Sequence, residues 1–418
     1  SLNRQFKIND LKLKSNINLY QLVYKNNLNN LKEYIPNINE SIELKDHVLL
    51  IDYEKNKIDI VGEGKIILKD KTDILKYKIK KKNDQYNFDT KIYINENPIL
   101  LNSILYKKKK DVKSLIKLEG TYKKNNQVKF NIISLKENKN IFLIKNLNLN
   151  DEFKILNFDY LSLNFLNKYK VKNQIKILKK DKRYKIEGKS FDFSKIINEI
   201  VNEKKEKSSS IFSNLNSSFD IQIDKTYLDK NVFVNNLNGF IDYKKNKINK
   251  LDLDSAFPNN NKLSLTINTN EKNEKITTLY SNYPKPLINQ YKFIKGFEEG
   301  VLDFYSIKKN NISNSILTID NFKVQEVPVL AKLLTLASLQ GIADLLTGEG
   351  IRFTDLEMKF SNEKKIMKIE ELYAIGPAIS ILLEGYIESE KLVSLRGTLV
   401  PATTINRSIA SIPLIGKI

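Results

Sequence analysis

Few residues of this chain have the type and spacing that catalysis or tight ligand binding requires. Gly188–Ser190 reads Gly-Lys-Ser, the ending of a phosphate-binding loop, but that loop also needs a glycine five residues before Gly188. The position holds Arg183, so the spacing does not favour a nucleotide site. Glu298–Gly300 places two carboxylates before a glycine, and a hairpin turn explains this run better than acid–base chemistry does.

The histidine and cysteine content narrows the chemistry further. His47 is the only histidine and there is no cysteine, so disulfides, thiolate metal sites and multi-histidine metal sites are excluded. No serine lies in a G-x-S-x-G turn, and a Ser–His–Asp site would have to use His47. We expect a surface or packing role for His47, no metal or other cofactor, and no enzymatic activity.

The charge balance is strongly basic but diffuse. The 418 residues include 70 Lys and Arg against 49 Asp and Glu, a formal net charge of +21. The excess is spread along the chain beside much Asn and Ile, which is typical of an AT-rich coding bias. Lys80–Lys82 and Lys107–Lys110 read as solvated loops, with attraction to anionic lipid headgroups as the functional alternative. Nucleic-acid binding is disfavoured because most aromatic residues fall on alternating apolar positions rather than on a basic platform.

No stretch of the sequence reaches the roughly 20 uninterrupted apolar residues of a membrane-spanning helix. Val327–Leu346 comes closest, but Lys332, Gln340 and Asp344 interrupt it. The chain opens at Ser1 without a signal peptide. We therefore expect it to be part of a longer protein whose N-terminal anchor lies outside this sequence.

Alternation of apolar and polar residues with period two dominates the chain. Ile51 and Tyr53 lead into a polar turn at 54–57 and the pattern resumes at Ile58, and another run covers Tyr86–Ile94. Short alternating runs joined by polar turns predict antiparallel hairpins with one apolar and one polar face. We predict a mainly β fold: an elongated antiparallel β-groove, a curled and twisted sheet, with a few short helices. The candidate groove-lining residues are Phe219, Ile221, Ile223, Leu237, Ile241, Tyr243, Leu251, Leu253, Leu263, Leu265 and Ile267.

Three segments have helical spacing. Tyr24, Leu28, Leu31 and Ile35 share one face of a short helix that Pro36 ends. Ser194 is a candidate cap for a helix carrying Ile196, Ile197, Ile200 and Val201, and the run 204–210 after it is the best linker. The third helix is apolar on most sides, covers 327–347, and stops at Gly348–Gly350. Its candidate residues for closing the groove or docking on a membrane are Leu330, Leu333, Leu334, Ala337 and Leu346.

The order of elements over the last two hundred residues resembles the C-terminal region of the bacterial AsmA-like family. The likeness rests on Phe297–Phe304, the apolar segment Val327–Leu346, the strand-like Gly350–Leu356, Ala374–Ala378, and the closing run Leu399–Gly416. Family members usually continue past that closing run, whereas this sequence ends at Ile418. Over residues 1–210 the likeness is limited to the general β pattern.

The resemblance implies a bridge-like lipid-transfer protein in the periplasm of a Gram-negative bacterium. Such proteins are anchored in the inner membrane and conduct phospholipid to the outer membrane, which supports the integrity of that membrane. The implied partners are phospholipids, the two membranes and envelope proteins at either end, with no nucleic acid. The corresponding domains are 1–207, an N-terminal groove segment, and 208–418, the AsmA-like region with strands at 211–323, the helix at 327–347 and closing strands and tail at 350–418.

Two other functions stay open at this point. A scaffold that assists assembly of outer-membrane β-barrel proteins would act through exposed sheet edges rather than through the apolar face. A basic nucleic-acid-binding protein would act through its lysines.

Overall fold

A computed structural model describes residues 11–25, 38–69, 71–123, 128–150, 154–201, 216–244, 247–289, 296–325, 350–388 and 392–401. The chain divides into two compact units, Ser1–Phe233 with Tyr243–Lys247, and Val234–Asp242 with Ile248–Ile418. Each is described by itself. The predicted boundary at 207/208 stays a prediction.

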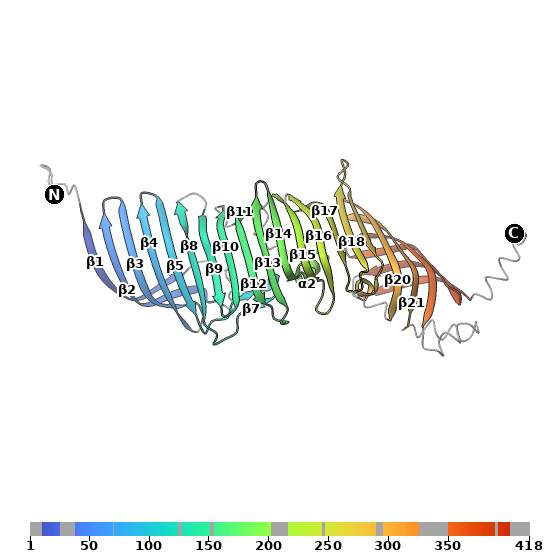
Figure 1. Ribbon diagram of the computed structural model, residues 1–418, viewed down its shortest axis with the longest axis horizontal. Helices are drawn as coiled ribbons and strands as arrows, with labels where there is room; N and C mark the ends of the chain where they lie inside the picture. Colours follow the sequence, from blue (N-terminus) through green and yellow to red (C-terminus); the bar gives the residue numbers. More distant parts are fainter. Residues whose placement is uncertain are drawn as a thin grey trace, which may run out of the picture. The chain divides into compact units, whose positions relative to one another are not determined.

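The first unit is built from long strands that follow one another in chain order (Figure 1). Its elements are β1 (Leu13–Lys25), β2 (Ser41–Glu54), β3 (Lys57–Ile67), β4 (Thr72–Lys82), β5 (Gln85–Ile94), β6 (Leu100–Leu101), the 3₁₀ turn η1 (Asn102–Ile104), β7 (Tyr106–Lys107), β8 (Ser114–Lys123), β9 (Val128–Glu137), β10 (Asn140–Leu149), β11 (Ile155–Asn157), β12 (Tyr160–Leu166), β13 (Lys172–Lys180), β14 (Arg183–Asp192), α2 (Ser194–Val201) and β15 (Ser217–Tyr227).

The second unit has the same character. Its elements are β16 (Phe233–Lys244, of which Val234–Asp242 belong here), β17 (Lys247–Ala256), β18 (Lys262–Thr269), β19 (Lys275–Ser281), α3 (Lys285–Ile288), β20 (Phe297–Lys309), β21 (Ile312–Val324), β22 (Ile351–Glu363), β23 (Ile366–Ile375), β24 (Ile379–Glu388) and β25 (Leu392–Pro401).

The prediction of a mainly β, antiparallel architecture with few helices is confirmed. Within the described ranges, twenty-three strands belong to one sheet, and β6 and β7 form a separate two-stranded ribbon. Neighbouring strands pair antiparallel from β1 to β5, and β5 then pairs with β8. Among the pairings of the described residues, β14 with β15 is parallel. A parallel neighbour needs a crossover connection, and the chain supplies it with the segment containing α2.

Asparagine explains how so many strands are joined by tight turns. Asn56, Asn83, Asn138 and Asn310 each stand between two strands with a positive φ of 50–61°. Asparagine enters this left-handed region more readily than other residues with a side chain, because its short amide bonds the local backbone. The frequent Asn of the sequence therefore has a structural role at these turns.

Several sequence expectations need correction. Tyr24 lies in β1, so the helix predicted at 24–35 does not begin there, and the rest of that segment lies outside the described residues. The helix at Ser194 is confirmed as α2, but Ser194 is its first residue rather than its cap. The Phe193 carbonyl accepts the Ile197 amide hydrogen at 2.8 Å, and Asp192 Oδ1 accepts the Ser194 amide hydrogen at 3.0 Å, which satisfies one of the amides that have no partner inside the helix.

The turn predicted at Glu298–Gly300 is also wrong. These residues lie inside β20, where Glu299 has a φ of 63° and Gly300 a φ of 91°. Positive φ inside a paired strand marks a β-bulge, which keeps the strand going while shifting its alternation. Glu299 there pairs with Lys323 at 3.2 Å and Arg352 at 3.3 Å. The predicted apolar helix at 327–347, with Leu330, Leu333, Leu334, Ala337 and Leu346, lies outside the described residues, as does the linker at 204–210.

Candidate functional site

The register of the first unit aligns apolar residues into a row that crosses twelve strands. Ile17 of β1 faces Leu49 of β2, and the same cross-strand neighbours continue as far as Ile221 of β15. In chain order the members of this middle row are Ile17, Leu49, Gly62, Tyr77, Thr90, Leu118, Ile133, Ile144, Leu161, Ile177, Ile186 and Ile221. No member is charged, and all except Gly62, Tyr77 and Thr90 are leucine or isoleucine, so the row is a largely aliphatic strip on one face of the sheet.

A second strip runs beside it, two residues along each strand and therefore on the same face. This lower row comprises Gly64, Leu75, Ile92, Ile116, Leu135, Phe142, Leu163, Ile175, Gly188 and Ile223. Bulges do not break either strip. At Asp46, whose φ is 52°, and at Asn146, whose φ is 52°, an extra residue shifts the alternation and the apolar side chains stay on one face.

The lower margin of this face is closed by a second layer. Ile99, Leu101 and Tyr106, from the segment between β5 and β8, pack against a buried cluster that includes Phe142 and Phe165. The Tyr106 ring lies 4.6 Å from Phe142 and 5.8 Å from Phe165, centroid to centroid. In Figure 1, β7 lies beside the lower end of β12. This part of the margin is therefore buried under a second layer.

Polar groups that are buried at the closed margin satisfy one another. The Tyr106 hydroxyl donates to Glu137 Oε2 at 2.6 Å, and Asn140 Nδ2 donates to the same oxygen at 2.8 Å. Asp73 accepts from the Asn95 amide at 2.9 Å and from Asn97 Nδ2 at 2.6 Å. Burial, and then the bond to Glu137, raise the pKa of Tyr106 far above its usual range. These bonds fasten the covering segment to the sheet.

Lys108 belongs to this buried layer, which corrects the expectation that Lys107–Lys110 is a solvated loop. Its side chain is fully buried, and Nζ donates to the carbonyls of Asn95 at 2.7 Å and Lys109 at 3.0 Å. Burial lowers the pKa of Lys108, and nearby carboxylates, Glu137 first among them, oppose that shift. Lys108 can be buried because its donors reach carbonyls that would otherwise be unpaired.

The middle row remains partly open. Leu118, Ile133, Ile144 and Ile177 are surrounded on the sheet by apolar neighbours, yet each keeps partial exposure. A side chain in that setting becomes fully buried when another layer packs on it. Ile133, Ile144 and Ile177 also pack against a buried cluster that includes Leu147 and Phe158, yet they stay partly exposed, whereas Ile175 on the same strand and face as Ile177 is 4% exposed.

The second unit repeats the arrangement. Its middle row crosses nine strands and comprises Leu253, Leu265, Leu279, Phe304, Leu317, Met358, Leu372, Leu383 and Gly397. A buried cluster that includes Leu302, Ile319 and Phe353 lies along it, and Leu279, Phe304 and Leu317 pack against that cluster while staying partly exposed. Each unit therefore carries its own continuous apolar strip.

The residues predicted to line the groove are distributed over both units, and their role in lining a groove stays a prediction. Phe219, Ile221 and Ile223 lie together on β15 in the first unit, and Ile221 and Ile223 end its two rows. Tyr243, on β16, falls in the first unit's range. The second unit holds Leu237, Ile241, Leu251, Leu253, Leu263, Leu265 and Ile267, with Leu251 facing Ile267 and Leu253 facing Leu265.

The sequence reasoning omitted residues 1–210 from the lining, although that part carries the longer rows. Period-two alternation is legible there, for example at Ile116 and Leu118. The alternation shifts by one residue at several points along the strands. The sequence alone therefore does not show which of two adjacent apolar residues lies on the same face as the apolar residues of the next strand.

His47 has the packing role that the sequence favoured. It is buried, its Nε2 lies 2.8 Å from the Lys65 carbonyl oxygen, and its Nδ1 lies 3.3 Å from the Tyr77 hydroxyl. The His47 ring covers Gly64 and the Tyr77 ring covers Gly62, where added Cβ atoms would stand 2.3 Å and 2.4 Å from ring atoms. Two glycines thus make room for two rings on the apolar face.

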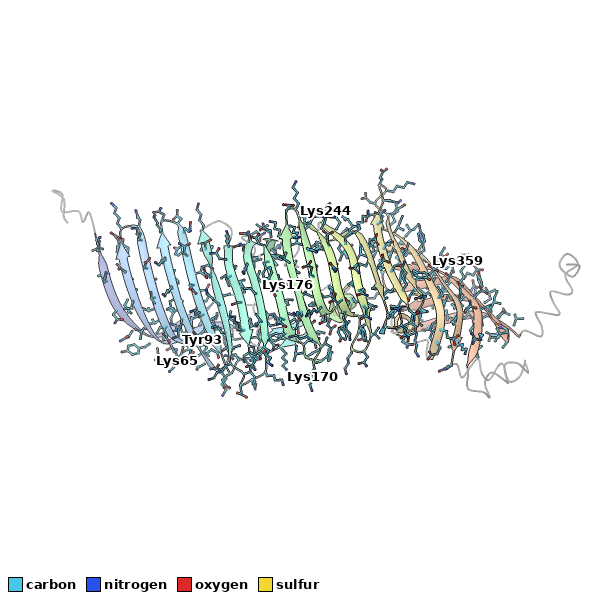
Figure 2. All side chains as sticks on the ribbon, in the orientation of Figure 1. Lys65, Tyr93, Lys170, Lys176, Lys244 and Lys359 are labelled. Atoms are coloured by element: carbon cyan, nitrogen blue, oxygen red, sulfur yellow. The ribbon has the colours of Figure 1, made fainter. Side chains whose placement is uncertain are left out.

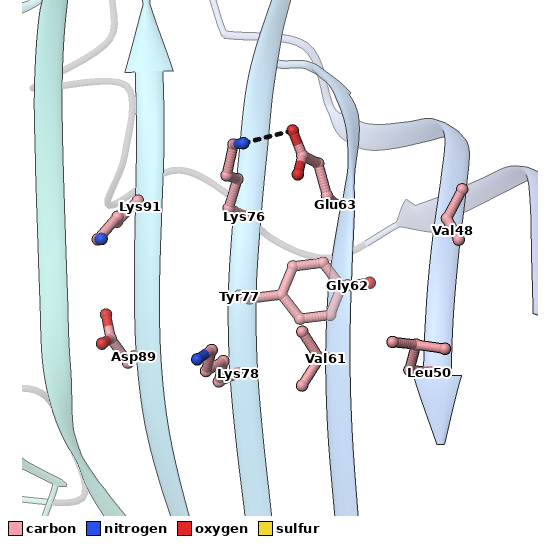
Figure 3. A pocket seen from close by; sticks show the side chains of 10 residues that line it. All are labelled: Val48, Leu50, Val61, Gly62, Glu63, Lys76, Tyr77, Lys78, Asp89 and Lys91. Atoms are coloured by element: carbon pink, nitrogen blue, oxygen red, sulfur yellow. Dashed lines mark ion pairs between the residues drawn. The ribbon is translucent and has the colours of Figure 1, made fainter. Parts of the chain in front are cut away.

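The opposite face of the first unit carries many lysines and carboxylates, together with the exposed apolar side chains of Val48, Leu50 and Val61. Lys176 of β13 is the cross-strand partner of Glu187 of β14, and Figure 2 labels this and other lysines. A shallow depression of about 440 Å³ lies between β2 and β5 on this face (Figure 3). Its lining residues are Val48, Leu50, Val61, Gly62, Glu63, Lys76, Tyr77, Lys78, Asp89 and Lys91. Lys76 pairs with Glu63 at 2.6 Å, and the lining contains no histidine, serine or cysteine to act as a nucleophile or base.

Comparison with known proteins adds no relative: no family model matches the chain, and no curated protein or solved structure matches it significantly. Within the described ranges, no helix has the length and apolarity needed to cross a membrane. The described residues also contain no group of three or more His, Asp or Glu side chains arranged to hold a metal ion.

Proposed function

We propose that this protein is a non-enzymatic, AsmA-like lipid-transfer protein whose apolar face works as a groove for phospholipid acyl chains. The largely apolar row in each unit is the observation that carries the proposal. In the cell the groove would conduct phospholipid through the periplasm between the inner and outer membranes and so support outer-membrane integrity. The family resemblance of the last two hundred residues supplies this setting.

The energetics favour such a strip over a single binding pocket. A lipid that leaves a bilayer exposes its chains to water at about 0.8 kcal/mol per CH₂. A row of side chains at the ~4.8 Å strand spacing offers equivalent apolar contact at every step. Because no step is much better than the next, a lipid that slides along the row meets no deep trap. The twelve strands of the first unit's middle row span on the order of 50 Å by this spacing.

Photocrosslinking tests the proposal with matched positions. A photoreactive amino acid at position 177 or 265 faces the apolar strip, while positions 176 and 264 belong to the neighbouring residues on the opposite face. After incubation with phospholipid vesicles and irradiation, we expect lipid adducts at 177 and 265 and none at 176 and 264. Equal labelling at all four positions, or at none, would count against a lipid groove.

A scaffold for β-barrel assembly is the second candidate, and one observation favours it. Among the described residues β1 pairs with β2 alone, which leaves its other edge without a strand. Its apolar side chains Leu13, Ile17 and Leu22 are 52%, 39% and 49% exposed. An unpaired edge of this kind accepts an added strand. Ile177→Asp separates the two functions, because it disrupts the strip and leaves the edge unchanged.

A further inference from the structure

The edge of the apolar face that lies next to the β2–β3 and β4–β5 turns contains tyrosines and a lysine, and these residues belong to neither of the two apolar rows. Beyond the middle row, β2, β3, β4, β5 and β8 each contribute two more residues to this face, and the second of each pair stands next to the turn. In register order these are Tyr53, Ile58, Lys81, Tyr86 and Tyr122. We call this set the tyrosine belt. It lies on the apolar face, because it is two residues along each strand from the strip that contains Ile51, Ile60, Ile79, Phe88 and Gly120.

The belt brings aromatic rings and a lysine close together next to the turns. Tyr86 and Tyr122 lie 6.0 Å apart by ring centroids, and Lys81 Nζ stands 5.5 Å from the Tyr86 ring centroid. The hydroxyls of Tyr53, Tyr86 and Tyr122 have no hydrogen-bond partner in the described part of the chain, and Tyr122 is 41% exposed. Amphipathic side chains of this kind gather where an apolar phase meets a polar one.

The turns next to the belt are basic. Lys55 and Lys57 flank the β2–β3 turn, Lys82 begins the β4–β5 turn, and Lys123 ends β8, all of them exposed. Lys57 is 3.7 Å from Glu54, whereas Lys55, Lys82 and Lys123 have no carboxylate within ion-pairing distance among the described residues. A positive margin attracts phosphate-bearing headgroups at about 1 kcal/mol per lysine.

A lipid headgroup cannot leave the apolar face across the closed margin, the edge that the segment between β5 and β8 covers. There the covering segment seals the sheet, and Asp73, Asn97 and Glu137 are buried and already bonded. Over β2–β8, a lipid whose chains lie along the two rows can therefore place its polar end past the tyrosine belt. Over β9–β15 the same margin is buried by Val128, Leu149, Phe158 and Tyr184.

We infer that the tyrosine belt with its lysine turns is the headgroup track of the first unit, selecting lipids with an anionic phosphate headgroup. This rests on the proposed function and specifies its substrate class. The phosphate lies beside Lys81 and accepts hydrogen bonds from the tyrosine hydroxyls, while the acyl chains lie over the middle row. The track orients every lipid in the same way, with chains toward the closed margin.

The experiment compares phosphatidylglycerol with diacylglycerol of identical chains, each presented to the full chain and measured by native mass spectrometry. The test variant is Lys81→Gln with Tyr86→Phe and Tyr122→Phe, which keeps every ring. The matched control is Lys78→Gln, three residues away on the same strand but on the opposite face. Inorganic phosphate is added separately as a competitor.

We expect the wild type and Lys78→Gln to prefer phosphatidylglycerol and the triple variant to lose about five-fold of that preference, the factor that one lysine contact represents. Diacylglycerol binding should be the same in all three proteins. A preference that survives in the triple variant, or that Lys78→Gln loses equally, overturns the headgroup track. Displacement of phosphatidylglycerol by inorganic phosphate at comparable concentration overturns it as well, since the belt would then be a free-anion site. Failure of the wild type to bind either lipid overturns the groove itself and is distinguishable from these results.

Discussion

Ile175 and Ile177 form a matched pair for testing whether the middle row is uncovered. Both are isoleucines on the apolar face of β13, two residues apart. Ile175 is 4% exposed and packs over Gly188, where an added Cβ would stand 2.5 Å from Ile175 Cγ2. Ile177 is only partly buried. Substituting each by alanine removes the same three carbon atoms from two different environments.

The expected costs differ by about 2 kcal/mol. Three fully buried carbons are worth roughly 2.4 kcal/mol at about 0.8 each. At Ile175 a cavity term adds to this, so Ile175→Ala should cost about 3–4 kcal/mol, inside the usual range for buried isoleucine. At Ile177 part of the side chain already meets water and the gap opens to solvent, so Ile177→Ala should cost about 1 kcal/mol.

Urea unfolding followed by circular dichroism measures the difference. With a slope of about 2 kcal/mol per molar urea, the two midpoints should lie roughly 1 M apart, with the slopes unchanged. Equal losses of stability would refute the reasoning, because they would mean that Ile177 is sealed under a second layer and that the acyl strip does not exist. If the middle row is uncovered as expected, saturating phospholipid should raise the urea midpoint of the wild type more than that of Ile177→Ala.

The remaining predictions concern the closed margin and the glycines. Tyr106→Phe should lower the free energy of unfolding by about 1.5–3 kcal/mol, because buried Glu137 loses a charge-assisted bond. Tyr160→Phe is the control: its hydroxyl has no hydrogen-bond partner among the described residues, so the same urea titration should show little change. The free energy of unfolding should rise with pH between the lowered pKa of Lys108 in the folded chain and its ordinary value of 10.5, because in that window the unfolded chain binds one more proton than the folded chain. The difference in unfolding free energy between wild type and Lys108→Met, measured across this window, reports the rise. A difference that does not change with pH would contradict the prediction. Gly64→Ala should lower the free energy of unfolding by about 1–3 kcal/mol through overpacking. Gly62→Ala should cost less, because its new Cβ meets the movable end of the Tyr77 side chain, whereas the new Cβ at position 64 meets the His47 backbone at 2.7 Å. Thermal unfolding of the two variants measures which is less stable.

The sequence predicted the architecture well wherever alternation was regular. The hairpin of β2 and β3, and strand β5, follow directly from Ile51, Tyr53 and Ile58 and from Tyr86–Ile94. It failed where a local signal had two structural solutions. Glu298–Gly300 carries turn residues, but pairing with β21 on one side of the strand converts them into a bulge. Tyr24 fits a helical stripe, yet its cross-strand partner Ile42 holds it in β1.

The candidate site was harder to predict than the fold. Alternation identifies an apolar face, and Leu253 and Leu265, which the alternation singles out, are cross-strand neighbours. It cannot identify which rows another layer covers, because that depends on contacts such as Tyr106 with Phe142 between segments far apart in the sequence. The buried Lys108 illustrates the same limit, since a run of four lysines shows no sign that one of them turns inward.

Lipid capture by the intact chain tests the central claim most directly. Native mass spectrometry of the wild type after incubation with phospholipid vesicles should show adducts of two-chain lipids. A variant with Ile177→Asp and Leu317→Asp, which puts one charge in the middle row of each unit, should lose most of them while keeping its circular dichroism spectrum. Absence of adducts in the wild type, or equal adducts in the folded variant, would contradict the account.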